Sequence, residues 1–165
     1  MREPPHQVVV NATPIIALAL VGRLNLLRQL YGEVVVPPAV RDEVLAGGQG
    51  AVGSAQMRQA TWIRTVMLQD PQRADLLSDL DRGEAEVLSL AQELGADLII
   101  IDERLARRHA KRVGLRLTGT LGVLLKAKSL GFVPTIAPLI DQLLEGGIYL
   151  SDAVVAEALE LAGEQ

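Results

Sequence analysis

The sequence predicts an α/β protein of three layers, in which helices cover both faces of a mostly parallel central sheet. Short apolar runs alternate with helical stretches nearly throughout the 165 residues. Those runs are continuously apolar rather than alternately apolar and polar, which is typical of strands buried on both faces of a parallel sheet. Since this length suits one core, we expect a single domain with its core over residues 7–145 and a helical extension over residues 146–165.

The first strand is expected at Val8–Asn11, where three valines precede a polar residue. A helix follows, with Thr13 as its N-cap and Pro14 in its first turn. Leucines at helical spacing then predict a second helix over residues 24–32, which ends at Gly32.

The middle of the chain contains two further expected strands, at 33–38 and 61–68. Proline stops the first of them and begins a helix over 38–48, which ends in a glycine pair. The glycine-rich stretch 46–60 connects this helix to the next strand and holds one short helix.

A polar connector over 69–83 leads to the clearest unit, an amphipathic helix, a stop at Gly95 and an apolar strand that ends at Asp102. The rest of the chain continues the alternation. The expected elements are a basic helix over 104–112, a turn and strand over 113–120, a helix over 121–131 and two closing helices.

Composition excludes several classes of function. Cysteine is absent, which rules out disulfides, zinc–thiolate sites and thiol catalysis. His6 and His109 are too few for a zinc triad, and no G-x-x-x-x-G-K-S/T or G-x-G-x-x-G motif indicates nucleotide binding. The longest apolar runs are too short to span a membrane and no secretory signal is recognisable, so we expect a cytoplasmic protein.

Several oxygen-bearing side chains are expected at one edge of the sheet. Asn11, Asp102 and Thr118 all end predicted strands, and right-handed crossovers bring strand ends together. Crowded carboxylates repel unless a cation neutralises them, and Mg²⁺ or Mn²⁺ bound by oxygen ligands can activate water at a phosphodiester. The expected pocket consists of Glu43, Glu84, Asp102, Asn11 and a hydroxyl of Thr118 or Thr120.

Each of these residues also has a purely structural interpretation. Glu84 completes a D-x-x-E capping box with Asp81, and Asp102 is placed to cap the basic helix. Glu43 is equally compatible with a solvated helix position, and Thr118 and Thr120 with capping the helix that follows them. The site hypothesis depends on all of them meeting at one edge.

Three segments together resemble PIN-domain proteins: VVVNATPIIALALVGRLNLL, VVVPPAVRDEVL and DRGEAEVLSLAQELGADLIIIDERLARRHAKRVGLRLTGTLGVLLKA. The similarity runs over roughly residues 7–145 and is closest to the branch with N/D-x-S/T-P, GEAE, IDE and GTLG motifs. PIN domains are metal-dependent ribonucleases on a parallel α/β sheet, and many are toxins of toxin–antitoxin pairs.

The resemblance implies a set of site residues. The acid of the first strand corresponds to Asn11, and the later acids correspond to Glu43, Glu84 and Asp102. Thr13 corresponds to a hydroxyl residue that supports the site. Glu86 and Glu103 are nearby acids that rank below Glu84 and Asp102. The family's cofactor is Mg²⁺ or Mn²⁺, and its members often form homodimers or bind a small antitoxin protein.

Asn11 departs from the family pattern, because active members commonly carry aspartate there. An amide can coordinate a metal but contributes no negative charge, so three carboxylates remain and weaker metal binding is expected. Two functions therefore stay open. One is a metal-dependent endoribonuclease, the toxin of a pair; the other is an inactive PIN protein that binds RNA or a partner.

The basic helix over 104–112 indicates which class of substrate the protein binds. Although the net charge is −4, five Lys and Arg residues are concentrated here, directly after Asp102. Cations beside an acidic pocket suit a phosphodiester substrate, with RNA phosphates bound at the helix. The alternative is an ordinary solvated surface helix. The candidate RNA-binding residues are Arg104, Arg107, Arg108, Lys111 and Arg112.

Overall fold

Five parallel strands form the centre of the molecule. The computed structural model describes residues 7–46 and 52–164, and within them the strands lie in the order β3-β2-β1-β4-β5. Every neighbouring pair is parallel, so the predicted three-layer α/β class is confirmed. The strands are β1 (Val8–Val10), β2 (Val34–Val36), β3 (Ile63–Thr65), β4 (Leu98–Ile100) and β5 (Leu117–Thr118).

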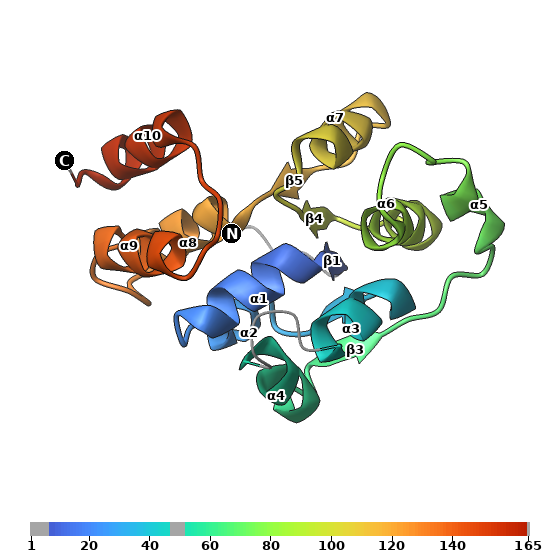
Figure 1. Cartoon of the computed structure of the whole chain (residues 1–165), viewed down its shortest axis with the longest axis horizontal. Helices are drawn as coiled ribbons and strands as arrows, with labels where there is room; N and C mark the ends of the chain where they lie inside the picture. The colour runs from blue at the N-terminus through green and yellow to red at the C-terminus, as the bar shows by residue number, and fades with distance from the viewer. Residues whose placement is uncertain (1–6, 47–51, 165) are drawn as a thin grey trace.

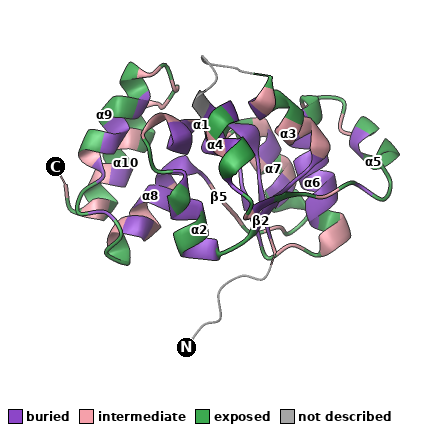
Figure 2. Cartoon of the chain, turned by 90° about the horizontal axis from the view of Figure 1, so that it is seen from below, coloured by how far each residue is buried: buried purple, intermediate pink, exposed green. Residues whose placement is uncertain are grey.

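The three inner strands are buried along their whole length, as continuous apolar runs require. All residues of β1, β2 and β4 are buried, whereas only Ile63 is buried in the edge strand β3. The low aromatic content is matched by a core of Val, Leu, Ile and Ala that fills the space between the layers (Figure 2). Removal of this apolar surface from water is the main favourable contribution to folding.

Helices cover both faces of the sheet. Figure 1 shows α6 and α7 on one side of the strands, and α1, α8 and α9 on the other. Among them, α6 contacts β1, β4 and α3, and α8 contacts α1, α2 and α10. The helices are α1 (Ala12–Leu20), α2 (Asn25–Tyr31), α3 (Pro38–Leu45), α4 (Val52–Gln59), α5 (Gln72–Asp75), α6 (Arg82–Leu94), α7 (Arg104–Arg112), α8 (Thr120–Ser129), α9 (Ala137–Glu145) and α10 (Asp152–Ala162).

Most helix ends agree with the sequence signals, with two exceptions. Gly32 and Gly95 follow α2 and α6 with positive φ angles, as predicted for helix-ending glycines. The prediction of Thr13 as N-cap of α1 is wrong, because Asn11 occupies that position with extended backbone angles. The connector over 69–83 also contains the short helix α5, which its polar sequence did not indicate. The glycine pair expected to end α3 lies outside the described residues.

The C-terminal helix is joined to the domain by one carboxylate. Glu164 accepts hydrogen bonds from the backbone N–H groups of Ile136 and Ala137, at the start of α9, and pairs with Lys128 of α8 at 2.8 Å. The hydrogen bond from Lys128, followed by those from the backbone, lowers the pKa of Glu164 to about 2. This carboxylate therefore stays ionised at neutral pH and holds α8, α9 and α10 together. No helix in the described part of the chain is long and apolar enough to cross a membrane.

The strand order has a consequence for function. Connections from β1 proceed outwards to β2 and β3, and the chain then returns to place β4 on the other side of β1. In parallel sheets of this kind, ligands bind at the carboxyl ends of the strands where the direction of winding reverses. The carboxyl ends of β1 and β4 are therefore the first place to look for a site.

Candidate active site

Asn11 lies directly at this reversal point. Its backbone N–H donates to the carbonyl of Ile100, at the end of β4, at 2.9 Å. The residue is only 5% exposed. Its side chain makes no capping hydrogen bond to α1, and no other partner for it exists among residues 7–46 and 52–164. Solvent still reaches this amide, because within the described residues Gln56 Oε1 is the one fully buried side-chain polar atom without a hydrogen-bond partner.

Oxygen atoms from three separate elements surround the open side of Gly83, in the first turn of α6. A Cβ atom placed on Gly83 would lie 3.6 Å from Oδ1 of Asp81, and 3.7 Å from both Oδ1 of Asn11 and Oε1 of Glu43. These residues follow β1, precede α6 and lie within α3. The missing side chain of Gly83 therefore leaves a small space that these oxygens line.

Asp81 and Glu84 form a capping box at the start of α6. Oδ1 of Asp81 accepts from the N–H of Glu84 at 2.8 Å, and Oε1 of Glu84 accepts from the N–H of Asp81 at 3.2 Å. The structural interpretation of the D-x-x-E pattern is thus confirmed. Capping is compatible with a role at the site, because only one oxygen of each carboxylate accepts a hydrogen bond at the helix end.

The surroundings of Glu84 disfavour the ionised form of its carboxyl group. Burial raises the pKa of its carboxyl to about 7, and the negative charges of Asp81, Glu103 and Glu43 act in the same direction. The pKa of Glu43 is also raised, first by partial desolvation and then by Asp81. These four acids are therefore electrostatic neighbours, and a cation among them would relieve their repulsion.

The carboxylate of Asp102 makes different contacts from those of Glu43 and Glu84. Its Oδ1 accepts from the N–H of Thr120 at 2.8 Å, and its Oδ2 accepts from the Thr120 hydroxyl at 2.6 Å. Both oxygens thus connect the end of β4 to the first turn of α8. The alternative that Asp102 caps the basic helix is wrong, because Glu103 is the N-cap of α7 and accepts from the N–H of Ala106.

Gly119 lies tightly beside this connection. A Cβ atom there would come within 2.5 Å of Oδ1 of Asp102 and 3.0 Å of Nη1 of Arg107. The same Arg107 nitrogen donates to the carbonyl of Ile101 at 3.0 Å. The first glycine of the GTLG motif is therefore required by close packing.

Glu86 positions α3, which carries Glu43, against α6. It is 8% exposed, accepts from the N–H of Ala39 in the first turn of α3 at 3.1 Å and pairs with Arg82 at 2.8 Å. A carboxylate at a helix N-terminus is favourable, because it satisfies an unpaired N–H and interacts with the helix dipole. Glu86 thus sets the distance between α3 and the start of α6.

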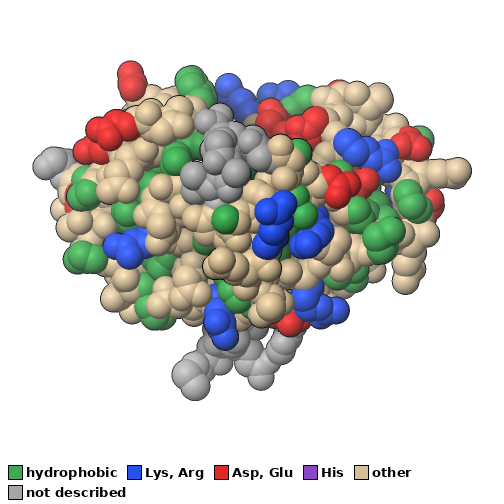
Figure 3. Space-filling view, turned by 60° about the horizontal axis from the view of Figure 1, so that its bottom comes forward, with side chains coloured by type: hydrophobic (Ala, Val, Ile, Leu, Met, Phe, Trp, Pro, Cys, Tyr) green, Lys and Arg blue, Asp and Glu red, His purple; other side chains and the backbone are tan. Residues whose placement is uncertain are grey.

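The other predicted residues occupy distinct places. Thr13 is exposed and Thr118 is half-buried in β5, so of the three predicted supporting hydroxyls only that of Thr120 is bonded to a predicted site residue. On α7, Arg107 is half-buried. The remaining candidate RNA-binding residues are exposed; they are Arg104, Arg108, Lys111 and Arg112. On the face in Figure 3, Lys and Arg side chains occur in small separate groups.

The geometry accommodates a divalent cation only in part. In the described ranges, no three His, Cys, Asp or Glu side chains are arranged so that they could hold a metal ion. The Asn11 amide oxygen, however, lacks a partner and faces the same space as Asp81 and Glu43. Since Mg²⁺ keeps several waters and needs only one or two carboxylates, these oxygens fit such an ion. Whether Glu43, Glu84, Asp102 and Asn11 bind metal stays a prediction.

The sequence did not indicate that Asp81 lies beside Asn11 and Glu43 in the fold. Its D-x-x-E spacing indicates a helix cap, and this interpretation is sufficient from the sequence alone. The signal that could have identified it is Gly83, two residues later, since a glycine inside a first turn leaves the neighbouring side chains uncovered. Glu103, placed below Asp102 in the ranking, also lies close enough to raise the pKa of Glu84.

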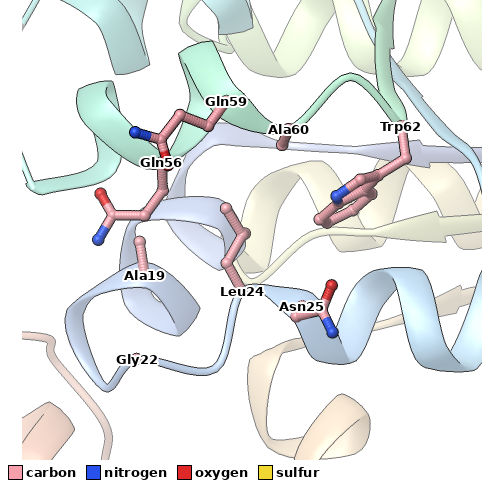
Figure 4. A pocket seen from close by; sticks show the side chains of 8 residues that line it. All are labelled: Ala19, Gly22, Leu24, Asn25, Gln56, Gln59, Ala60 and Trp62. Atoms are coloured by element: carbon pink, nitrogen blue, oxygen red, sulfur yellow. The ribbon is translucent and has the colours of Figure 1, made fainter.

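A second depression lies away from these residues. It has a volume of about 390 Å³ and is lined by Trp62, three amide side chains and residues at the end of α1 (Figure 4). Trp62 immediately precedes β3, which places this depression at the amino end of the strands. Its lining contains no ionisable side chain, so acid–base or metal chemistry is not located there.

Comparison with known families agrees with the fold. A family model described as a PIN domain matches residues 7–164. The all-parallel five-stranded sheet and its flanking helices define an α/β domain of the PIN type. The chain belongs to the PIN-domain family. No curated protein sequence matches it.

The raised pKa of Glu84 makes a prediction for stability. The carboxyl titrates at 4.5 when unfolded and at about 7 when folded, so the folded protein holds a proton that the unfolded chain loses. This contribution to stability is present below pH 4.5 and is lost as the pH rises through 7. In metal-free protein we expect Glu84→Gln, which keeps an acceptor for the Asp81 N–H, to raise the free energy of unfolding by up to about 3 kcal/mol at about pH 8.

Urea unfolding at about pH 5 and pH 8 measures this difference. At the lower pH the two proteins should differ much less, because wild-type Glu84 is then largely protonated. A variant that is no more stable than wild type at the higher pH would contradict the expectation.

Close packing at Gly119 makes a second prediction. Gly119→Ala places a methyl group against Oδ1 of Asp102, which must move and lose its bonds to Thr120. Overpacking of this kind costs about 1–3 kcal/mol, measurable as a lower midpoint of urea unfolding. The matched control is Gly53→Ala in α4, where a Cβ would make only ordinary contacts at 3.5 Å. Equal stability of both variants would show that the Asp102–Thr120 connection tolerates displacement.

Proposed function

We propose that this protein is a metal-dependent endoribonuclease of the PIN type. The observation that carries the proposal is the space beside Gly83, where the unpartnered amide oxygen of Asn11 meets carboxylate oxygens of Glu43 and Asp81. The space lies where the winding of the sheet reverses, which is where folds of this class bind ligands. Membership of the PIN-domain family supports the same chemistry.

The chain's residues would act in separate roles. Glu43 and Asn11, together with the acids at the start of α6, would hold Mg²⁺ or Mn²⁺. A divalent cation bound there lowers the pKa of water and stabilises negative charge at a scissile phosphate. Burial and the neighbouring acids raise the pKa of Glu84 to about 7, and a cation held there would relieve this repulsion and favour the ionised carboxylate as a ligand.

The basic helix supplies the contacts to RNA phosphates in this proposal. α7 begins two residues after Asp102 and has nine residues. At about 1.5 Å per residue, its last basic residue lies roughly 12 Å along the axis from its first. Arg104 is therefore nearest to the acids and Arg112 farthest. Few aromatic residues are present for base stacking, so recognition would depend on backbone charge.

The biological setting follows from the family resemblance. We propose the toxin of a type II toxin–antitoxin pair, which acts in the cytoplasm, cleaves RNA to 5′-phosphate and 3′-hydroxyl products, and assembles as a homodimer. Its partner would be a small antitoxin protein.

One observation favours a second candidate function. The amide at position 11 leaves the site with one negative charge fewer than an aspartate there would give. A site with this reduced charge would suit an inactive PIN protein that binds RNA or a protein partner. Cleavage assays distinguish the two candidates.

Glu43 offers the cleanest test of catalysis. Its side chain is exposed, and within the described residues it forms no hydrogen bond or ion pair, so Glu43→Gln should leave the fold intact. In single-turnover cleavage of labelled RNA with Mn²⁺, we expect Glu43→Gln to reduce the rate at least about 100-fold, as loss of a metal-site carboxylate does. The control is Asp42→Asn, an exposed neighbour in the same helix, which should cleave like wild type. Wild-type protein that cleaves no RNA would instead support the second candidate.

Binding of RNA should depend on salt through α7. The double variant Arg104→Gln/Arg108→Gln removes two exposed cations, and we expect it to weaken binding and to make the slope of log K against log salt shallower by about 1.4, or 0.7 per phosphate contact. Fluorescence anisotropy with single-stranded RNA at several salt concentrations measures the slope. Arg23→Gln/Arg28→Gln, at the opposite end of the strands, removes the same charge elsewhere. If both double variants change the slope equally, α7 has no special role.

A further inference from the structure

We infer that the depression beside Trp62 is a binding site for a purine base, with adenine preferred. The base would contact the indole ring of Trp62 and form hydrogen bonds with the amide side chains that line the depression, which are those of Asn25, Gln56 and Gln59. The depression lies at the opposite end of the strands from the acids. The inference therefore goes beyond the proposed nuclease and does not depend on it.

The shape and lining of the depression are the first argument. Its volume of about 390 Å³ is within the usual range for small-molecule sites. Its apolar lining residues are buried; they are Ala19, Leu24 and Ala60. Two of the three amides, those of Asn25 and Gln59, belong to exposed residues. An apolar floor with a few polar groups around it suits a flat ring with polar edges.

Trp62 is the second argument. It is half-buried, packs against the hydrophobic core and lines the depression. Figure 4 shows its side chain extending towards Leu24 and Asn25, with Gln56 and Gln59 on the other side of Leu24. Aromatic rings of this kind are surfaces on which nucleic-acid bases stack. The core holds the indole ring in place, and the depression gives a ligand access to it.

Gln56 gives independent evidence that the depression receives a ligand. Its Oε1 is the one fully buried side-chain polar atom of the described residues that has no hydrogen-bond partner. A buried acceptor in this state destabilises the folded protein. Because Gln56 lines the depression, rotation about its soft terminal torsion can bring this oxygen to an N–H donor of a ligand. Binding would then satisfy an acceptor that is otherwise unpaired.

The same groups indicate the class of ligand. A side-chain amide has both donors and an acceptor, and it pairs with the edge of adenine that carries the N6 amino group and the N7 acceptor. Among the described residues that line the depression, none is ionisable, so a phosphate would find no charged partner there. The base, rather than the phosphate, should therefore determine the affinity. Adenosine, AMP and adenine in RNA all carry this base.

The fluorescence of Trp62 is a direct readout, because the chain has one tryptophan. In metal-free buffer with EDTA, we expect adenosine and AMP to quench it saturably and with similar midpoints. Uridine, which has a carbonyl in place of the amino group, should need at least about tenfold higher concentration. Ribose 5-phosphate, which has no base, should cause no change. Saturation-transfer NMR of the adenine protons measures the same binding independently of light absorption.

Two variants remove one amide each and keep the tryptophan. We expect Gln56→Leu and Gln59→Ala each to raise the adenosine midpoint at least about fivefold. Gln56→Leu also removes the unpaired acceptor, so its urea unfolding midpoint should equal or exceed that of wild type. The matched control is Gln142→Ala, at an exposed position of α9, which should bind adenosine like wild type.

Short oligoadenylate and oligouridylate distinguish the source of the base. If oligoadenylate quenches Trp62 as adenosine does and oligouridylate does not, the site accepts bases of RNA. If only adenosine and AMP quench it, the ligand is a free nucleoside or nucleotide. Either result supports a base-binding site.

Three results would overturn the inference: adenosine causes no saturable change at millimolar concentrations, uridine or ribose 5-phosphate acts as strongly as adenosine, or Gln56→Leu and Gln59→Ala bind adenosine like Gln142→Ala. A fluorescence change that follows protein concentration alone would also overturn it, because a second copy of the chain would then cover Trp62. None of these results affects the proposed nuclease, which Glu43→Gln tests separately with Mn²⁺.

Discussion

The first turn of α6 is the constraint on which the site depends. Asp81 and Glu84 close this turn by reciprocal hydrogen bonds, and Glu86, one turn further on, accepts from the start of α3. Because α6 also contacts β1, β4 and α3, its first turn fixes where the polar residues after β1 and within α3 can meet. Gly83 keeps the meeting point free of side-chain atoms.

The carboxylates that cap α6 are therefore among those proposed to act at the site. A helix N-terminus attracts negative charge, since its first N–H groups are unpaired and its dipole is positive there. This attraction allows several acids to gather at α6, whereas their mutual repulsion and burial raise the pKa of Glu84 to about 7. Strain of this kind is common at functional sites, where stability is exchanged for reactivity. Asn11, at the end of the central strand, is uncharged, so one negative charge fewer contributes to this repulsion than if aspartate stood there.

Much of the fold could be predicted, because its signals are local. The valine runs of β1 and β2 and the LII run of β4 are continuously apolar, and such runs are buried strands in parallel sheets. The start of α1 was misplaced by two residues, since asparagine and threonine are both good N-caps and only the backbone angles decide between them. The short helix α5 was missed because four residues carry too little periodicity.

By itself, the sequence determined the α/β class, the order of the elements, and the placement of polar residues at strand and helix ends, because each of these depends on neighbours along the chain. Only the tertiary structure decided which residues distant in the chain form hydrogen bonds with one another. Asp102 binds Thr120, 18 residues away, and Glu86 binds Ala39, 47 residues away. Such pairings depend on the strand order β3-β2-β1-β4-β5 and on helix packing, which no local pattern encodes. For the same reason Asp81 is a plain helix cap in the sequence and a neighbour of Asn11 in the fold.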